Sequence, residues 1–279
     1  MIVHACQRDG VGGSPTAIID ESPLTDAERR AIPVAAGTSH AVFVHRTSRS
    51  SATLRFFTSE GELPACGHGT VAALAMLGRD DDHAQFQVQA GGRTFAGTSM
   101  RVNGELVASF DPGPVTLTTA VDSDIAAILN AIGVEPAHAN CCIASVGRSR
   151  LLVEIGDRAA LAGINPDLAG LRAACDRLGL LGCYVYATPT PDNRTAARMF
   201  APSIGVPEDI ANANSTACLA AHLADRAGRA SRSGSRDLLV DMGDSLGQPA
   251  TVRASVTSGP GGPRVLVGGT ARMIDDDTP

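Results

Sequence analysis

The feature of this sequence that most constrains its fold is an internal repeat. Two segments share one pattern: a strand-like run, a polar loop with glycine or proline, a small-residue turn and an Ala/Leu-rich helix. They occupy residues 54–75 and 197–220, and each follows another β-branched and aromatic run, at 41–44 and 183–186. Corresponding positions lie about half the chain apart, as expected for two halves of one ancestral design.

The helices of the two repeats are apolar around their whole circumference. Residues 71–77 and 216–223 are almost entirely small or aliphatic. Because a helix without a polar face is buried on every side, we expect strands to wrap a central helix in each half. Thr70 and Ser215 carry hydroxyls that suit a helix N-cap, so they are expected to open these helices.

The predicted fold is α+β, with two pseudo-symmetric lobes that each wrap a mixed or antiparallel sheet round a central apolar helix. Pro112-Gly113-Pro114 ends a strand near the midpoint, so the predicted lobes are 1–114 and 115–261, and strand 262–279 returns to the first lobe. Other expected strands are 17–19, 86–89, 106–110, 151–155, 238–240 and 264–267. Expected helices are 25–31, 122–132 and 166–178, with a loop at 231–236 and a frayed tail at 275–279.

Composition excludes several classes of protein. All 23 basic residues are Arg, so catalysis through a lysine Schiff base and Walker-type phosphate binding are excluded. A net charge of -6 with scattered signs gives no footprint for nucleic acid. No signal peptide is recognisable and no run approaches the ~18 apolar residues of a membrane helix, so a cytoplasmic protein is predicted. Seven cysteines without a C-x-x-C pair predict reduced thiols and no structural zinc site.

The candidate site lies where the buried helices begin. A helix N-terminus offers unpaired N–H groups and the positive end of its dipole, so two facing helix starts form a cradle for carboxylates. The first start carries Cys66 and His68 between glycines, and a helix dipole favours a thiolate there. Either residue alone would more often be structural. Joined in Cys-Gly-His-Gly-Thr at the start of an apolar helix, they favour a functional site.

Four further residues are candidates on chemical grounds. His40 lies at the start of a predicted strand, where its repeat counterpart is Gly182, so the two halves differ here. An imidazole can accept and return a proton at neutral pH, although a lone histidine at a strand end is more often a surface residue. At the second helix start, Asp209 with Asn212 and Asn214 would bind or orient a polar group; as an N-cap cluster they would serve structure alone.

The order of these motifs resembles the PhzF-like family, within the diaminopimelate-epimerase-like fold. The resemblance covers nearly the whole chain. It implies two pseudo-symmetric lobes, an active site in the cleft between them, no cofactor, and a homodimer. The stretches that carry it are Gly13-Ser14-Pro15 with residues 16–18, then 38–43, 57–58, 62–68, 145–147, 151–153, 198–202 and 205–209.

Two departures from the family bear on the chemistry. His40 stands where well-known members carry a catalytic Glu, and Cys66-Gly67-His68-Gly69 replaces their Ala-Gly-His-Pro. The cysteine version resembles the motif of proline racemases, which need a second cysteine from the other lobe. This chain has Ala211 or its neighbours there, and Cys218 lies about two helical turns into the second helix. Racemisation by two opposed bases is therefore disfavoured.

The leading hypothesis is a cofactor-independent isomerase that moves a proton or double bond in a small cyclic or unsaturated amino-acid-like carboxylate, in secondary-metabolite or antibiotic biosynthesis. His40 would shuttle the proton and Cys66 would be a second acid/base or a substrate contact, while His68 and Asp209 would bind and polarise the substrate. The expected substrate-binding residues are Ser14, Gly67, Gly69, Thr70, Asn212, Asn214 and Ser215, with no metal. The alternatives are a proline-racemase-like epimerase, a hydroxyproline dehydratase, and an inactive small-molecule-binding protein.

Overall fold

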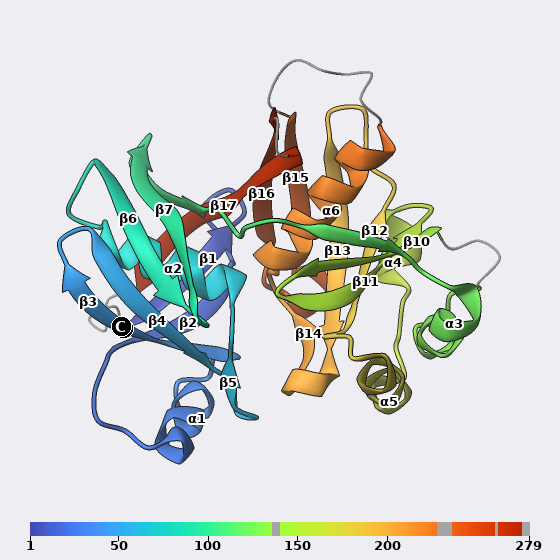
Figure 1. The fold of residues 1–279 in the computed structure, drawn as a ribbon, viewed down its shortest axis with the longest axis horizontal. Helices are drawn as coiled ribbons and strands as arrows, with labels where there is room; N and C mark the ends of the chain where they lie inside the picture. The colour runs from blue at the N-terminus through green and yellow to red at the C-terminus, as the bar shows by residue number, and fades with distance from the viewer. Residues whose placement is uncertain (136–139, 228–235, 260–261, 275–279) are drawn as a thin grey trace.

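The computed structural model describes residues 1–135, 140–227, 236–259 and 262–274, and Figure 1 shows two lobes side by side. Strands of the first lobe surround helix α2 (Gly67–Leu77), and strands of the second surround α6 (Ala213–Arg226). The expected α+β fold of two similar lobes is confirmed. The predicted tail 275–279 and all but the last residue of the predicted loop 231–236 lie outside the described residues.

The remaining elements follow in chain order. The strands are β1 (Ile2–Gln7), β2 (Ser14–Asp20), β3 (His40–Ser48), β4 (Ser51–Phe57), β5 (Glu62–Leu63), β6 (His83–Ala90), β7 (Arg93–Val102), β8 (Glu105–Phe110), β9 (Thr116–Thr119), β10 (Asn140–Val146), β11 (Arg148–Ile155), β12 (Cys183–Ala187), β13 (Arg194–Ala201), β14 (Val206–Asp209), β15 (Arg236–Met242), β16 (Ala250–Gly259) and β17 (Gly262–Ile274). The other helices are α1 (Asp26–Ala35), α3 (Asp122–Ala131), α4 (Arg158–Ala162) and α5 (Leu168–Leu178), with 3-10 turns η2 (Pro202–Ile204) and η3 (Asp244–Leu246).

The strands of the first lobe form a closed ring round α2. Pairing runs from β1 through β2, β3, β4, β6, β7 and β8 to β17, which pairs back with β1. In the second lobe the row runs from β9 through β10, β11, β12, β13 and β15 to β16. Since β17 also pairs with β16, one strand joins the two sheets. The exact lobe limits stay a prediction.

The two central helices are buried as their composition predicts. In α2 every residue except Met76 is buried, and the first nine residues of α6, 213–221, are buried as well. Small residues let strands pass close to the helix: a Cβ on Gly97 of β7 would lie 2.7 Å from a methyl of Leu74. An Ala- and Gly-rich interface therefore substitutes for the aromatic side chains that this chain largely lacks.

The prediction that Thr70 and Ser215 open these helices is wrong, because both helices begin earlier. The Thr70 hydroxyl donates to the Cys66 carbonyl at 2.7 Å, a bond that a threonine makes inside a helix rather than at its cap. Asn212 caps α6, and its Oδ1 accepts from the Ser215 N–H at 2.9 Å. Cys66 occupies the N-cap position of α2 without a side-chain capping bond, so the first N–H groups of α2 have no cap to bind.

Shorter helices cover the outside of the lobes. The helices expected at 25–31, 122–132 and 166–178 correspond to α1, α3 and α5, and a capping box of Thr25 and Glu28 opens α1. Helices α3 and α5 pack together on the outer face of the second lobe, over a separate hydrophobic cluster. Among the described residues, none of the helices has both the length and the apolar character needed to cross a membrane.

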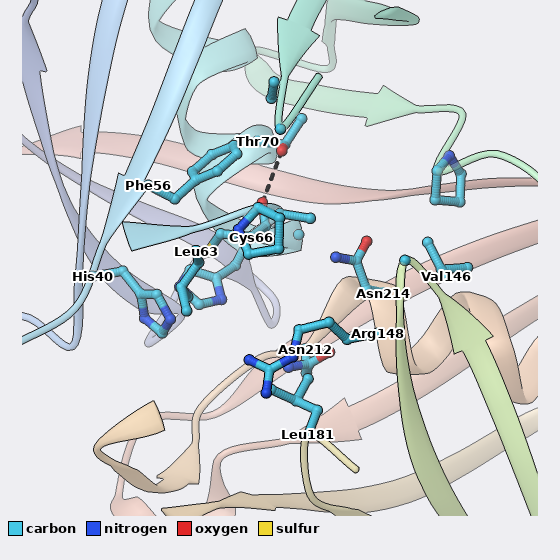
Figure 2. Close-up of a pocket in the computed structure, with 18 of the residues that line it drawn as sticks. His40, Phe56, Leu63, Cys66, Thr70, Val146, Arg148, Leu181, Asn212 and Asn214 are labelled. Carbon is cyan, nitrogen blue, oxygen red and sulfur yellow. Dashed lines mark hydrogen bonds between the residues drawn. The ribbon is translucent and has the colours of Figure 1, made fainter. Parts of the chain in front are cut away.

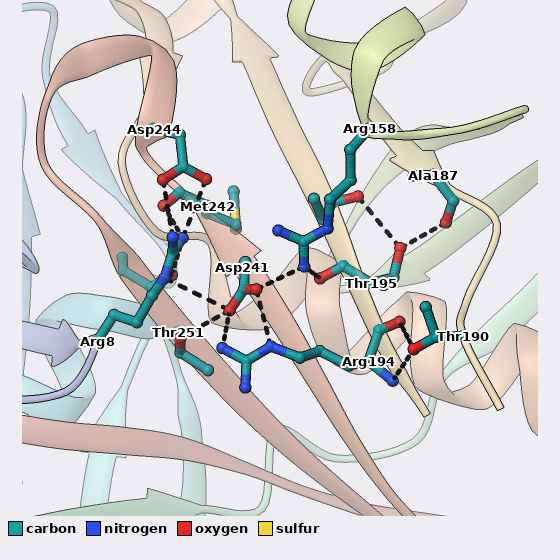
Figure 3. Close-up of polar contacts among 12 residues, drawn as sticks. Arg8, Arg158, Ala187, Thr190, Arg194, Thr195, Asp241, Met242, Asp244 and Thr251 are labelled. Carbon is teal, nitrogen blue, oxygen red and sulfur yellow. Dashed lines mark hydrogen bonds and ion pairs between the residues drawn. The ribbon is translucent and has the colours of Figure 1, made fainter. Parts of the chain in front are cut away.

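A buried ion cluster fastens the two lobes to each other beside β15 (Figure 3). Asp241, whose side chain is 3% exposed, accepts two bonds from Arg194, at 2.8 and 2.7 Å, and one from Arg158 at 2.6 Å. Thr251 donates to it at 2.9 Å, and Arg8, which follows β1, lies 3.5 Å away. Burial alone would raise the pKa of Asp241, but the arginine and threonine hydrogen bonds lower it below its ordinary value.

Candidate active site

A cavity of about 290 Å³ lies between the lobes, where the N-termini of α2 and α6 meet (Figure 2). The helix starts approach so closely that a Cβ on Gly67 would lie 2.7 Å from the Ala213 side chain and 2.9 Å from the Asn214 nitrogen. Only glycine fits at such a contact. Residues of both helix starts line the cavity, so the positive ends of two dipoles act on the same space.

His40 enters the cavity as the first residue of β3. Its side chain is buried, and its ring lies edge-on to the ring of His68, with the centroids 4.4 Å apart. The Ser39 hydroxyl is 2.9 Å from His40 Nδ1. Burial, and then the charge of His68, hold the pKa of His40 well below its ordinary value. The imidazole of His40 is therefore neutral at pH 7 and is available as a base.

His68, the second residue of α2, has the opposite electrostatic setting. Its Nδ1 lies 2.8 Å from the carbonyl oxygen of Ala211 and 3.8 Å from Asp209 Oδ1. Burial disfavours the charged ring, but negative charge at Cys66 and Asp209 and the bond to Ala211 outweigh it and raise the pKa of His68 to about 10. At neutral pH His68 is thus an imidazolium that donates to Ala211. A neutral and a charged imidazole stand side by side.

Asp209 ends β14 and is buried at the second helix start. Asn212 Nδ2 donates to its Oδ2 at 2.9 Å, while Oδ1 has no hydrogen-bond partner within the described part of the chain. Burial raises the pKa of Asp209, and His68 and Asn212 oppose that rise. Asn212 caps α6, as one of the two readings of this cluster suggested, and it also orients a cavity-lining carboxylate; the binding of a substrate group by this cluster stays a prediction.

Cys66 brings a thiol to the same point. Its Sγ lies 3.5 Å from His68 Nε2, and a Cβ on Gly69 would come within 2.9 Å of the sulfur, so this glycine makes room for the thiol. One donor atom each from His40, Cys66 and His68 lies within 4.8 Å of the others. Such a nitrogen and sulfur set suits an ion like Zn²⁺. Whether the protein depends on a metal is open to a direct chelator test.

The structure gathers most, but not all, of the predicted site residues. Three predicted residues do not line the cavity: Ser14 is buried in β2, Gly69 is buried in α2 and Ser215 is buried in α6. The second thiol considered from the sequence, Cys218, is buried inside α6 and does not line the cavity either. The predicted residues that do line it are His40, Cys66, Gly67, His68, Thr70, Asp209, Asn212 and Asn214.

Sequence reasoning missed the arginines of the cavity wall. Arg148 and Arg150 lie on β11 and Arg93 begins β7. A signal for the first two was present, because residues two apart on a strand face the same side, and Arg148 and Arg150 both lie within three residues of Gly147. Two arginines that share one face of a strand indicate that this face is polar.

Comparisons with known proteins agree with this geometry. A model of the family described as phenazine biosynthesis-like protein matches residues 3–276. An uncharacterized isomerase of Deinococcus radiodurans is 29% identical over 273 residues, which cover 95% of this chain and 88% of that protein. The trans-2,3-dihydro-3-hydroxyanthranilate isomerase of Pseudomonas chlororaphis is 28% identical over 226 residues, 80% of this chain and 79% of its own.

Solved structures show the same fold. A predicted epimerase from Pseudomonas aeruginosa superposes with a TM-score of 0.80 at 24% identity, covering 98% of this chain and 96% of that one. A hydroxyproline epimerase from Agrobacterium vitis, with bound trans-4-hydroxy-L-proline, superposes with a TM-score of 0.61 at 12% identity, covering 98% and 88%. The fold is therefore shared with both PhzF-like and proline-racemase-like proteins.

Proposed function

Because the chain belongs to the family of phenazine biosynthesis-like proteins and is an isomerase, we propose that it moves a proton, and with it a double bond, within a small cyclic or unsaturated amino-acid-like carboxylate. The observation that carries this proposal is the neutral, buried imidazole of His40 beside a cavity into which two helix N-termini converge. One base next to an anion cradle suits a proton transfer along one face of a substrate.

The reaction we propose needs no cofactor. The substrate carboxylate lies at the N–H groups near Gly67 and Asn214, where the dipoles of α2 and α6 favour negative charge. In the tautomer whose Nδ1–H donates to Ser39, His40 Nε2 accepts a proton from a substrate carbon, and the C–H electron pair enters the conjugated system. The double bond shifts, and His40 returns the proton to a second carbon on the same face, so no proton or electron is gained or lost.

The neighbouring charges favour that cycle. A bound carboxylate would bring negative charge to His40 and raise its pKa, which makes the imidazole a stronger base only when substrate is present. The imidazolium of His68 and the N–H groups would stabilise the charge that develops on the substrate. Asp209, through its free Oδ1, would accept a hydrogen bond from a substrate amino or hydroxyl group. Cys66 would contact the substrate or serve as a second acid/base.

The cysteine arrangement disfavours the epimerase alternative. Opposed-base racemisation needs one group on each face of the reacting carbon, and Cys66 is the single cysteine that lines the cavity. At the expected position of a second cysteine this chain carries Ala211 or its neighbours, none of which is a cysteine. We propose further that the protein is a cytoplasmic homodimer of secondary-metabolite or antibiotic biosynthesis that binds no nucleic acid, in keeping with its net charge of -6.

The experiment that tests this function follows the transferred proton. The protein is incubated in deuterium oxide with trans-2,3-dihydro-3-hydroxyanthranilate and with ring-unsaturated proline-like carboxylates, and proton NMR and ultraviolet absorbance are recorded. We expect one substrate to lose its original chromophore as the double bond moves. The His40→Asn variant, which keeps a donor for Ser39 but lacks Nε2, should turn over about 10²- to 10⁴-fold more slowly.

A matched control lies on the same strand. His45 is an exposed residue of β3, so His45→Asn should leave turnover unchanged. Full turnover by His40→Asn would refute the shuttle role. Exchange of the α-hydrogen of L-proline or trans-4-hydroxy-L-proline with inversion would instead support an epimerase, and calorimetric binding of these carboxylates without any exchange would support an inactive binding protein.

A further inference from the structure

The cavity wall holds more positive charge than its own carboxylate balances. Three arginines line it, Arg93, Arg148 and Arg150, whereas Asp209 is the single carboxylate among the lining residues. The chain as a whole has a net charge of -6, so this local excess runs against the overall charge. A local reversal of charge in a concave site indicates a negatively charged ligand.

Arg150 provides the strongest evidence. Its side chain is 1% exposed, and its guanidinium donates to the Arg148 carbonyl at 2.6 Å and to the Ser215 hydroxyl at 3.4 Å. Its Nε–H has no partner within the described residues, and none of their carboxylates forms an ion pair with it. A buried charge without a counter-charge destabilises a fold by several kcal/mol. A cation in such a place therefore indicates a role in function rather than in stability.

The groups around Arg150 cannot neutralise it. Burial raises the pKa of the Cys218 thiol, and it raises the pKa of the Tyr184 hydroxyl, so both are uncharged at neutral pH. The remaining charged neighbour, Arg148, is itself a cation. Since no group within the described parts of the chain balances Arg150, a bound anion is the expected source of its counter-charge.

Arg148 extends the same positive surface into the cavity. It begins β11, and Figure 2 shows its guanidinium pointing into the cavity on the side of Asn212. Its side chain is half-buried and makes no hydrogen bond or ion pair with any residue that the structure describes. Two guanidiniums on one face of one strand thus present unused donors, a pattern that suits the oxygens of a carboxylate or phosphate.

We propose that Arg148 and Arg150 form a subsite for a second acidic group of the substrate. The inference rests on the proposed function and narrows it: the substrate carries one carboxylate for the helix starts of α2 and α6 and a second carboxylate or phosphate for the two arginines. The cavity of about 290 Å³ holds a small diacid of this kind.

Binding of simple anions tests this subsite without any turnover. Calorimetry compares each straight-chain dicarboxylate, succinate, glutarate and adipate, with the monocarboxylate of the same carbon number, and compares glutarate with phosphonobutyrate to separate a carboxylate from a phosphate-like group. We expect the best dianion to bind at least about tenfold more tightly than its matched monoanion. In Arg148→Met that preference should disappear, while affinity for the monoanion stays the same.

Two further variants make the outcome decisive. Arg30→Met removes the same charge from the exposed face of α1 and should keep the preference for dianions. Arg150→Lys keeps a buried cation but loses the guanidinium, and it should reduce dianion affinity if the protein folds. Equal binding of matched mono- and dianions, no binding of any dianion, or a preference that survives in Arg148→Met overturns the subsite. The isomerase proposal stands apart, since deuterium transfer by His40 decides it.

Discussion

Two regions of this protein bury charge, and they treat it in opposite ways. At the Asp241 cluster a buried carboxylate is surrounded by Arg194, Arg158 and Arg8, so every buried charge has a partner. In the cavity wall the equally buried Arg150 has only neutral hydrogen-bond partners, and no carboxylate among the described residues pairs with it. The first arrangement holds the lobes together whether or not a ligand is present. The charge of Arg150 is balanced only when an anionic ligand is bound. An unbalanced buried charge therefore distinguishes a binding site from a structural ion cluster.

The largest effect that would test this contrast is on stability at the joint. Asp241→Ala leaves three arginines around a vacated carboxylate position, and we expect the free energy of unfolding to fall by about 3–5 kcal/mol. Urea denaturation measures it. Asp244→Ala is the control: Asp244 also pairs with Arg8, at 2.7 Å, but its side chain is 58% exposed, so its loss should cost less than about 1 kcal/mol. Similar losses for both variants would contradict the contrast.

The next effect concerns how the free energy of unfolding depends on pH. The pKa values of the two neighbouring histidines of the cavity are shifted in opposite directions, so stability should fall on both the acid and the alkaline side. The pKa of His40 is lowered in the fold, so the unfolded chain binds more protons below pH ~6.5 and stability falls as the pH drops. The pKa of His68 is raised to about 10, so the folded chain holds the extra proton above pH ~6.5 and stability falls as the pH rises towards 10.

Each histidine should contribute a slope of up to about 1.4 kcal/mol per pH unit in its own range. Urea denaturation at pH values from 5 to about 10 measures the slopes for the wild type, His40→Asn and His68→Asn. The first variant should lose the acid-side slope and the second the alkaline-side slope. If both variants retained both slopes, the opposite charge states of the two rings would be wrong.

A smaller change in the free energy of unfolding, opposite in sign to that of Asp241→Ala, is expected when Arg150 is replaced. Arg150→Met removes an unbalanced buried cation, so the ligand-free protein should be as stable as the wild type or more stable by about 1 kcal/mol. Thermal and urea unfolding without added anions measure this. If Arg150→Met lost as much free energy of unfolding as Asp241→Ala, Arg150 would be needed for the stability of the fold, and its role in binding an anionic ligand would be wrong.

The smallest expected effect is that of a chelator. The proposed cycle uses a neutral imidazole and helix N–H groups, so dialysis against EDTA should leave turnover and melting temperature unchanged. A loss of activity restored by Zn²⁺ would instead mean that His40, Cys66 and His68 hold an ion.

The sequence allowed the burial of the central helices to be predicted, because helices of such apolar composition are compatible only with the interior of a protein. Residues 71–77 offer no polar face, so burial followed directly. Strands β7 and β16 were missed because Thr, Ser, Arg and Gly alternate with only modest apolar residues, a pattern typical of a ring with one face in water. The helix starts were misplaced because a hydroxyl in the first turn resembles a cap, and only the fold shows that Asn212 fills that position.

The candidate site was predictable where neighbouring residues share one turn, and not where distant segments meet. Cys66, His68 and His40 could be selected from local motifs, and all three line the cavity. Ser14 follows the family motif but packs into β2, since a motif does not reveal which way a strand residue faces. Arg150 was missed because its significance lies in what is absent around it, and that depends on every segment that packs against it.

The position of β17 has a consequence for the order in which the molecule can assemble. Residues 262–274 fill the place between β1 and β8, near the opposite end of the chain, and they also pair with β16. Because β17 follows every strand of the second lobe in the chain, the residues of that lobe are synthesised before the ring round α2 can close. Until then the edges of β1 and β8 stand open, and both halves of the protein reach their final form together.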